Sequence, residues 1–154
     1  MRAVVQRVAR AAVSVDGETI GEIGPGLLVL LGVGHGDQQQ TAASLATRIT
    51  GLRIFEDPEG KMNLSLKETG GAALCISQFT LYGDVRRGRR PSFTDAAPPN
   101  LARPLYNAFC LAIEAQGIRC EKGRFGEHMV VSLVNDGPVT LVIDSEDLER
   151  PRRG

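Results

Sequence analysis

The sequence of 154 residues lacks tryptophan and has few residues that commonly bind metals. Its two histidines, His35 and His128, are too far apart in the sequence to form a metal site with the scattered acidic residues. The cysteines Cys75, Cys110 and Cys120 show no C-x-x-C spacing, and their odd number favours reduced thiols in a cytosolic setting. Their simplest interpretation is that of small buried hydrophobic residues. We therefore expect no metal and no cofactor.

The chain also lacks an excess of charge and a long apolar run. Eighteen basic residues balance eighteen acidic ones, which excludes the overall basic field of a general nucleic-acid coat protein. Any contact with RNA must then come from a local patch. The longest apolar run, 27–33, is far shorter than the ~20 residues of a membrane helix, and arginines interrupt residues 1–12 too often for a secretory signal. A cytoplasmic location without membrane contact is expected.

Common catalytic signatures are missing as well. The sequence has no G-x-S-x-G elbow, and no Lys-Ser/Thr pair follows Gly34-His35-Gly36, as a phosphate-binding loop would require. His128 alternates with Val130 and Ser132 and is predicted to be an ordinary strand residue. Hydrolysis by this chain would therefore depend on backbone donors, on positioning, or on a group of the substrate.

The apolar pattern predicts one α+β domain of about eight strands and two helices, with the strands curved into a barrel-like sheet that mixes parallel and antiparallel pairs. The domain is expected to span 1–145, and the charged tail 146–154 is expected to fray together with Ser145. Strands are predicted at 3–8, 11–15, 18–23, 27–33, 72–79, 118–122, 128–134 and 139–144, and residues 62–66 are predicted to be extended.

Two segments have helical spacing of their apolar residues. The first helix is predicted to begin at Asp37, with Gln40 as its capping-box partner. The start of the second helix is open because of Pro104: either the helix begins at Pro99 with a bent first turn, or regular helix begins near Arg103.

A long polar segment, 83–100, precedes the second helix and carries four arginines, at positions Arg86, Arg87, Arg89 and Arg90. On a loop, these side chains either contact the phosphates of an RNA, which would make binding sensitive to salt, or form an ordinary solvated surface. The sequence leaves both interpretations open.

Two short runs lie where a buried strand meets a turn. The first, Ser77-Gln78-Phe79-Thr80-Leu81, offers two hydroxyls and an amide beside free backbone N–H groups. The second, Asn135-Asp136-Gly137-Pro138-Val139-Thr140, contains a Gly-Pro step. Both are places where backbone groups can be aimed at a ligand.

Both runs resemble the signature motifs of the D-aminoacyl-tRNA deacylases, the D-tyrosyl-tRNA deacylase family. These enzymes hydrolyse the ester that wrongly links a D-amino acid to tRNA, a proofreading step of translation. The resemblance covers nearly the whole chain, in the same order, through the runs Val5–Val8, Gly26–Val33, Gly60–Leu64, Arg90–Phe93 and Gly123–Gly126.

The resemblance implies a compact β-rich fold with two helices and a homodimer whose active sites lie at the interface. It also implies a cis bond at Gly137–Pro138, in a loop that reaches the pocket of the partner subunit. The carbonyl oxygens of Gly137 and Pro138 would then exclude the side chain of an L-amino acid, whereas a D-amino acid places hydrogen there. Glycine passes such a filter, so glycyl-tRNA hydrolysis is implied too.

Ser77, Gln78, Phe79 and Thr80 are implied to form the opposite wall, with backbone N–H groups near Phe79 and Thr80 as an oxyanion hole. The Thr80 hydroxyl is either a nucleophile or a group that positions the substrate while the 2′-OH of the terminal adenosine activates water. Gln78 would bond the ligand or brace the loop, and Phe79 would contact the ligand or pack in the core.

Two further residues are implied to support this site. Arg7 lies within a predicted strand, where a buried charge needs a partner; it either braces the Gly137–Pro138 loop or lies on a solvated strand face. Met129 is implied to lie near the amino-acid end of the pocket. The preceding Gly126-Glu127-His128 departs from the small or acidic residues that are more usual in the family.

Two other functions remain open at this point. One is a hydrolase that uses Thr80 as a covalent nucleophile on small esters or amides. The other is a tRNA-binding module without catalysis. The expected partners are tRNA and a second copy of the chain, and DNA is not expected because it lacks the 2′-OH.

Overall fold

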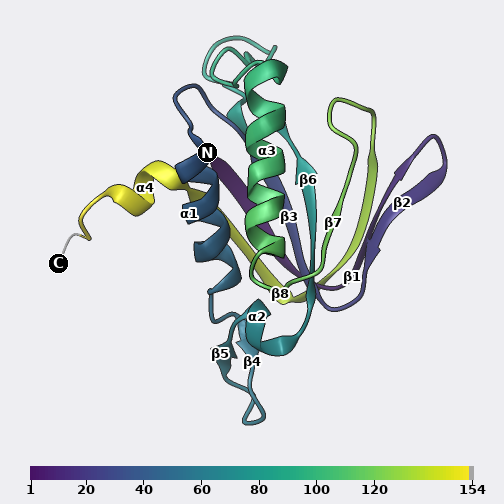
Figure 1. Cartoon of the computed structure of the whole chain (residues 1–154). Coiled ribbons are helices and arrows are strands. Elements are labelled where there is room, and N and C mark those ends of the chain that lie inside the picture. Colours follow the sequence, from purple (N-terminus) through teal and green to yellow (C-terminus); the bar gives the residue numbers. More distant parts are fainter. Residues whose placement is uncertain (153–154) are drawn as a thin grey trace.

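Strand β1 (Arg2–Val15) organises the sheet of this protein, whose computed structural model describes residues 1–152 (Figure 1). One edge of β1 pairs antiparallel with β3 (Gly26–Gly32) and β2 (Glu18–Ile23), and the other pairs with β8 (Val130–Asp144). β3 continues the sheet through parallel pairing with β6 (Ala72–Ser77), and β6 pairs with β7 (Cys120–Lys122). The sheet is therefore mixed, as predicted.

Two long helices cover one side of this sheet, α1 (Gln39–Thr50) and α3 (Pro99–Glu114), and they lie side by side (Figure 1). β3 and β6 are buried along nearly their whole length because helices cover one face and the curved sheet covers the other. The largest fully buried side chains of the helices are Leu45, Ile49, Phe109 and Ile113. This core holds the end of β6 in a fixed position.

A small hairpin lies at one end of the domain. β4 (Phe55–Glu56) pairs with β5 (Met62–Leu64), and the short helix α2 (Leu66–Thr69) follows. The extended prediction for 62–66 is therefore correct only for its first part. Ser65 caps α2 instead, because its hydroxyl accepts the Glu68 N–H and the Glu68 carboxylate accepts the Ser65 N–H.

One predicted helix start was wrong, and the structure decides the start that was left open. α1 begins at Gln39 rather than at Asp37, because the Asp37 carboxylate accepts the Gly34 N–H at 2.7 Å and does not cap the helix. The capping-box partner is Thr41 and not Gln40 as predicted: the Gln38 N–H donates to Thr41 Oγ1 at 3.1 Å. α3 begins at Pro99 and keeps Pro104 inside it. Pro104 is exposed and lies near the start of the helix. Because proline has no N–H, the helix loses one backbone hydrogen bond to its first turn.

Several predicted strand boundaries also differ. The two strands predicted at 3–8 and 11–15 form the single strand β1. Those predicted at 128–134 and 139–144 form the single strand β8, which begins only at Val130. Both strands are continuous because β1 and β8 pair with each other along both halves. The strand after 118 begins at Cys120, and β6 ends at Ser77. Among the described residues, no helix is long and apolar enough to cross a membrane.

The chain after β8 forms helix α4 (Ser145–Glu149), where fraying was expected. The Asp144 carboxylate accepts the Glu146 N–H at 2.9 Å and so caps this helix. The prediction of fraying was wrong because it considered only the high charge of this segment and overlooked Asp144 as a helix cap. Arg153 and Gly154, at the end of the predicted tail, lie outside the described residues.

Candidate functional site

The first run singled out in the sequence lies where β6 leaves the sheet. The Gln78 N–H donates to Leu31 O at 2.7 Å and completes the pairing with β3, after which residues Phe79–Tyr82 form a 3₁₀ turn. The first N–H groups of such a turn have no acceptor within it. Within residues 1–152, the N–H groups of Phe79 and Thr80 donate to no other backbone group. Two adjacent donors are therefore free to bind a ligand.

A cavity of about 590 Å³ opens beside this turn. Ser77, Gln78 and Phe79 form one wall, and residues 125–129 form another. The start of α3 contributes Pro99 and Ala102. Its remaining lining is mostly apolar, which suits the side chain of an amino acid more than a highly charged ligand.

Phe79 belongs to the rim of the cavity and not to the core. Its side chain is 56% exposed, and its ring meets that of Phe93 edge to face, with 5.2 Å between the centroids. The alternative of core packing is therefore wrong. Both rings line the cavity.

Thr80 lies just outside the cavity lining, with its side chain exposed. Its hydroxyl accepts a hydrogen bond from the Gln78 amide, so Gln78 braces the turn. Within the described residues, no histidine, lysine or carboxylate forms a hydrogen bond with the Thr80 hydroxyl. Among these residues, no side chain is thus hydrogen-bonded to the hydroxyl as a base that could take its proton.

The second run forms an outward loop in the middle of β8. Gln6 pairs with Thr140 and Val8 pairs with Asn135, so four residues of β8, 136–139, lie opposite Arg7 alone. The Gly137–Pro138 bond is cis, and both residues are exposed. Neither residue lines the cavity of its own chain.

Arg7 lies beneath this loop, and only 5% of it is exposed. Its guanidinium donates to Asp136 O at 3.2 Å and to Ile54 O at 2.6 Å, and it lies 3.5 Å from the Asp136 carboxylate. The Asn135 amide donates to Arg7 O at 2.9 Å and to Val139 O at 3.1 Å. The solvated-face alternative for Arg7 is wrong: its side chain braces the loop.

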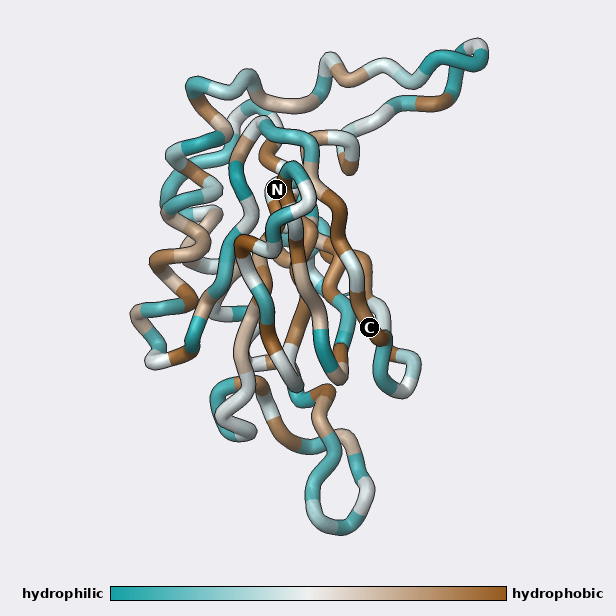
Figure 2. The backbone as a smooth tube through the Cα atoms, turned by 90° about the vertical axis from the view of Figure 1, so that its right-hand side faces the viewer, coloured by the Kyte–Doolittle hydropathy of each residue, from teal (hydrophilic) through white to brown (hydrophobic). Residues whose placement is uncertain are grey.

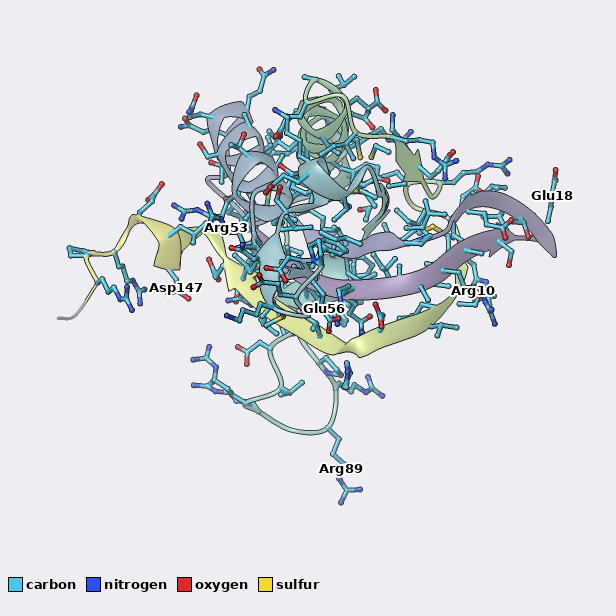
Figure 3. The ribbon with its side chains drawn as sticks, turned by 90° about the horizontal axis from the view of Figure 1, so that it is seen from below. Arg10, Glu18, Arg53, Glu56, Arg89 and Asp147 are labelled. Atoms are coloured by element: carbon cyan, nitrogen blue, oxygen red, sulfur yellow. The ribbon has the colours of Figure 1, made fainter. Side chains whose placement is uncertain are left out.

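The arginine loop, defined as residues 84–92, extends away from the body of the molecule. Figure 2 shows its hydrophilic tip, and Figure 3 shows Arg89 pointing into solvent. Backbone hydrogen bonds between Asp84 and Ser92 close its base. Arg86 lies 2.7 Å from the Asp84 carboxylate and lowers the Asp84 pKa to about 2. Within residues 1–152, Arg87, Arg89 and Arg90 form no ion pair, so three of the four cations are available.

The cavity lining includes residues that sequence reasoning did not assign, among them Phe93, Phe125, Glu127 and His128. His128 is exposed and precedes β8, so its prediction as a strand residue was wrong. Met129, which was implied to lie near the pocket, is half-buried in the lining. Phe93 and Phe125 lie in two of the runs that carry the family resemblance. An aromatic residue within such a run was the signal that could have indicated a cavity residue.

Known proteins resemble this chain along nearly its full length. A family described as D-Tyr-tRNA(Tyr) deacylase matches residues 4–144. A D-aminoacyl-tRNA deacylase of Symbiobacterium thermophilum is 61% identical over 146 residues, 95% of this chain and 97% of that protein. A D-aminoacyl-tRNA deacylase of Chloroflexus aurantiacus is 60% identical over 153 residues, 99% of this chain and 96% of that protein. A solved structure described as c-Myc DNA Unwinding Element Binding Protein is 41% identical, with a TM-score of 0.87 over 94% of this chain and 98% of that one. These similarities confirm the α+β fold class.

Proposed function

This chain belongs to the D-Tyr-tRNA(Tyr) deacylase family, and we propose that it hydrolyses the ester between a D-amino acid and the 3′-terminal adenosine of tRNA. Its class is that of a hydrolase acting on aminoacyl-tRNA esters. The observation that carries the proposal is the cavity beside two free backbone N–H groups, those of Phe79 and Thr80.

The geometry of that turn suits an ester carbonyl. Two adjacent N–H donors stabilise the negative oxygen of the tetrahedral intermediate, a contribution of roughly 10²–10³ in rate per donor. With the carbonyl there, the amino-acid side chain reaches the apolar lining around Met129 and Phe125. The adenosine lies toward the exposed rim at Phe79.

A second copy of the chain completes the site in this proposal. The Gly137–Pro138 loop is exposed and held by Arg7, yet it does not line the cavity of its own chain. Within residues 1–152, β8 pairs with β1 alone, which leaves its outer edge without a partner strand. The exposed apolar side chains of β8 are Val130, Leu133, Val134 and Val142. A homodimer covers them and brings each loop to the partner's cavity.

Stereochemical selection follows from that arrangement. The carbonyl oxygens of Gly137 and Pro138, placed beside the substrate's α-carbon, leave room for a hydrogen atom but not for a side chain. An L-amino acid is rejected by this contact, whereas a D-amino acid and glycine are accepted. Arg7 contributes to selection because it braces the loop. If the carbonyl groups of Gly137 and Pro138 could move aside, they would no longer exclude the side chain of an L-amino acid.

The water that attacks the ester is activated by the substrate itself in this proposal. Thr80 has no hydrogen-bonded base among the described residues, and an unassisted threonine hydroxyl is a poor nucleophile. The 2′-OH of the terminal adenosine lies next to the ester and takes the role of the base, while Thr80 and Gln78 position the substrate. DNA lacks that hydroxyl and is no substrate.

The body of the tRNA extends toward the arginine loop. Among the described residues, Arg87, Arg89 and Arg90 supply unpaired positive charge on a chain whose net charge is zero, which suits contact with phosphates of any sequence. Action on tRNA during translation places the protein in the cytoplasm.

The first test is the deacylation rate of matched D-tyrosyl-tRNA and L-tyrosyl-tRNA, with purified protein and a chelator. We expect rapid loss of the D-ester alone. Equal loss of both esters would point to a general esterase, with an acyl-enzyme on Thr80 as its signature. Loss of neither, with tRNA still bound, would point to a binding module.

A second substrate isolates the role of the 2′-OH. D-Tyrosyl-tRNA with a terminal 2′-deoxyadenosine keeps the ester at the 3′ position but lacks the proposed base. We expect it to bind as the normal substrate does and to be hydrolysed at least 10²-fold more slowly. Unchanged hydrolysis would rule out substrate assistance while leaving the deacylase activity itself intact.

A further inference from the structure

The three cysteines, isolated in the sequence, meet in the core. Cys75 comes from β6, Cys110 from α3 and Cys120 from β7. The sulfur atoms of Cys75 and Cys120 are 3.7 Å apart, and all three sulfurs lie within 4.8 Å of one another. Cys75 and Cys110 are buried, whereas Cys120 is half-buried and opens the group toward solvent. We call Cys75, Cys110 and Cys120 the thiol cluster.

The register of the sheet opposes a disulfide between the two strand cysteines. Cys120 pairs with Ala73, and Cys75 pairs with Lys122, so the two cysteines are diagonal neighbours two residues out of register. Strands about 4.8 Å apart with a rise of about 3.3 Å per residue place such Cα atoms about 8 Å apart. A disulfide requires less than about 7 Å. This spacing opposes a disulfide between Cys75 and Cys120, and all three cysteines are free thiols in the structure.

Three sulfurs at this spacing suit a common ion at their centre. When each sulfur bonds one central ion at ~2.3 Å, the sulfurs lie about 4 Å from one another, close to the 3.7 Å that separates Cys75 and Cys120. Within residues 1–152, no fourth Cys, His, Asp or Glu joins the group. This disfavours a closed tetrahedral zinc site, which takes four ligands.

We propose that the thiol cluster binds a soft, thiophilic ion with three sulfur ligands, Cu(I) being the biological ion of this class. Thiolates select Cu(I) over harder ions, and Cu(I) accepts trigonal coordination. Each S–H bond that is replaced by a Cu–S bond releases one proton to solvent, and the ion keeps its oxidation state.

The surroundings of the thiol cluster affect the pKa values of its three thiols in different directions. The thiols of Cys120 and Cys75 hydrogen-bond to Cys110 and lower its pKa. Lys122, paired with Glu114 at 3.1 Å, lies near enough to favour negative charge on Cys110 and Cys120. Hydrogen bonding to Cys110 raises the pKa of both Cys75 and Cys120, so these two sulfurs lose their protons only as the ion binds. The cation of Lys122 then offsets part of the charge of the complex.

The same three elements lead to walls of the cavity. β6 leads to Ser77, α3 begins with Pro99 beside the cavity, and the chain after β7 continues to Met129. An ion in the thiol cluster thus cross-links the supports of the cavity. Because it binds the folded chain and not the dispersed thiols of the unfolded one, it raises the unfolding temperature.

The test is an anaerobic titration of the reduced protein with Cu(I), in competition with a chromophoric Cu(I) chelator. We expect one tightly held ion per chain, with three sulfur neighbours by X-ray absorption and an unfolding temperature raised by several degrees. A wild-type ion with nitrogen or oxygen neighbours would overturn the proposal, and so would equally tight binding of Zn(II).

Two variants separate the cluster from simple thiol content. Cys120→Ser removes one sulfur and is expected to weaken Cu(I) binding at least tenfold. The control combines Cys120→Ser with Ser44→Cys, which restores three thiols but places one on the exposed face of α1. We expect the control to bind as weakly as Cys120→Ser. A control that matches the wild type would show adventitious thiol binding only; should Cys120→Ser fail to fold, the wild-type spectrum alone decides.

Discussion

The guanidinium of Arg7 occupies the space that a side chain at position 137 would need: a Cβ on Gly137 would lie 2.5 Å from Arg7 Nη2. Gly137 also has φ +118, a conformation that side chains rarely adopt. The same arginine therefore supports the loop and restricts its second residue to glycine.

Replacing Gly137 by alanine should disrupt the loop and, with it, the activity. We expect Gly137→Ala to lower the free energy of unfolding by about 1–3 kcal/mol and to slow D-tyrosyl-tRNA deacylation more than tenfold, because Arg7 or the loop must move. Denaturant unfolding and single-turnover rates measure the two effects.

Gly60→Ala is the matched control for this variant. Gly60 also has a positive φ, +78, but no atom lies within 4 Å of an added Cβ. It should cost about 1 kcal/mol through backbone strain alone and leave the deacylation rate unchanged. If both variants lose activity alike, crowding against Arg7 is not the reason for the loss.

Arg7→Gln should loosen the filter as well as the fold. It removes the buried donor to Asp136 O and Ile54 O, so we expect a loss of roughly 2–4 kcal/mol in unfolding free energy. We also expect a smaller ratio of D- to L-tyrosyl-tRNA hydrolysis, because the loop carbonyls are no longer fixed.

Arg10→Gln serves as the control for Arg7→Gln, since Arg10 lies on the same strand with its side chain in solvent (Figure 3). It should change neither the stability nor the D/L ratio measurably. An Arg7→Gln enzyme with an unchanged D/L ratio would show that bracing of the loop does not contribute to selection.

Thr80→Ala tests how the hydroxyl contributes. Because Thr80 is exposed and its hydroxyl bonds only Gln78 among the described residues, stability should change by less than about 0.5 kcal/mol. We expect deacylation to slow by less than the 10²–10³ of a lost oxyanion donor, because the two backbone N–H groups remain. A completely inactive variant that still binds tRNA would instead make Thr80 the nucleophile.

Much of this fold could be predicted from the sequence, because buried strands and amphipathic helices leave clear apolar patterns. β3, β6, α1 and α3 all came from such patterns, with errors of a few residues at their ends. Those ends depended on side-chain contacts such as the Asp37 bond to Gly34, which periodicity does not contain.

The candidate site was harder to predict because its walls come from distant segments. Ser77 and Gln78 were assigned from a motif, but His128 and Phe93 reach the cavity only through the path of their loops. The thiol cluster could not be predicted either, because the sequence shows only the spacing of the three cysteines and not that the fold brings them together.

The arginine loop should affect binding of tRNA and not the chemical step. We expect Arg87→Gln with Arg89→Gln to raise KM for D-tyrosyl-tRNA and to reduce the slope of log KM against log salt by about 1 per lost phosphate contact. The rate at saturating substrate should not change. Arg10→Gln with Arg48→Gln removes the same charge from other exposed positions; if it weakens binding equally, the loop has no special role.

Mixing two inactive variants tests whether the site is shared between subunits. Gly137→Ala damages the loop, and Phe79→Asp places a charge on the opposite wall, where the side chain is exposed and folding is spared. If the loop of one subunit serves the cavity of the other, a mixed dimer contains one site with both defects and one with neither.

At equal mixing, half of the dimers are mixed, so we expect about one quarter of the wild-type activity to return. The measurement is D-tyrosyl-tRNA deacylation after the two proteins are unfolded and refolded together. Refolding each variant alone controls for recovery. Chains whose loop and wall meet within one subunit would give no gain on mixing, because every site would then carry one of the two defects.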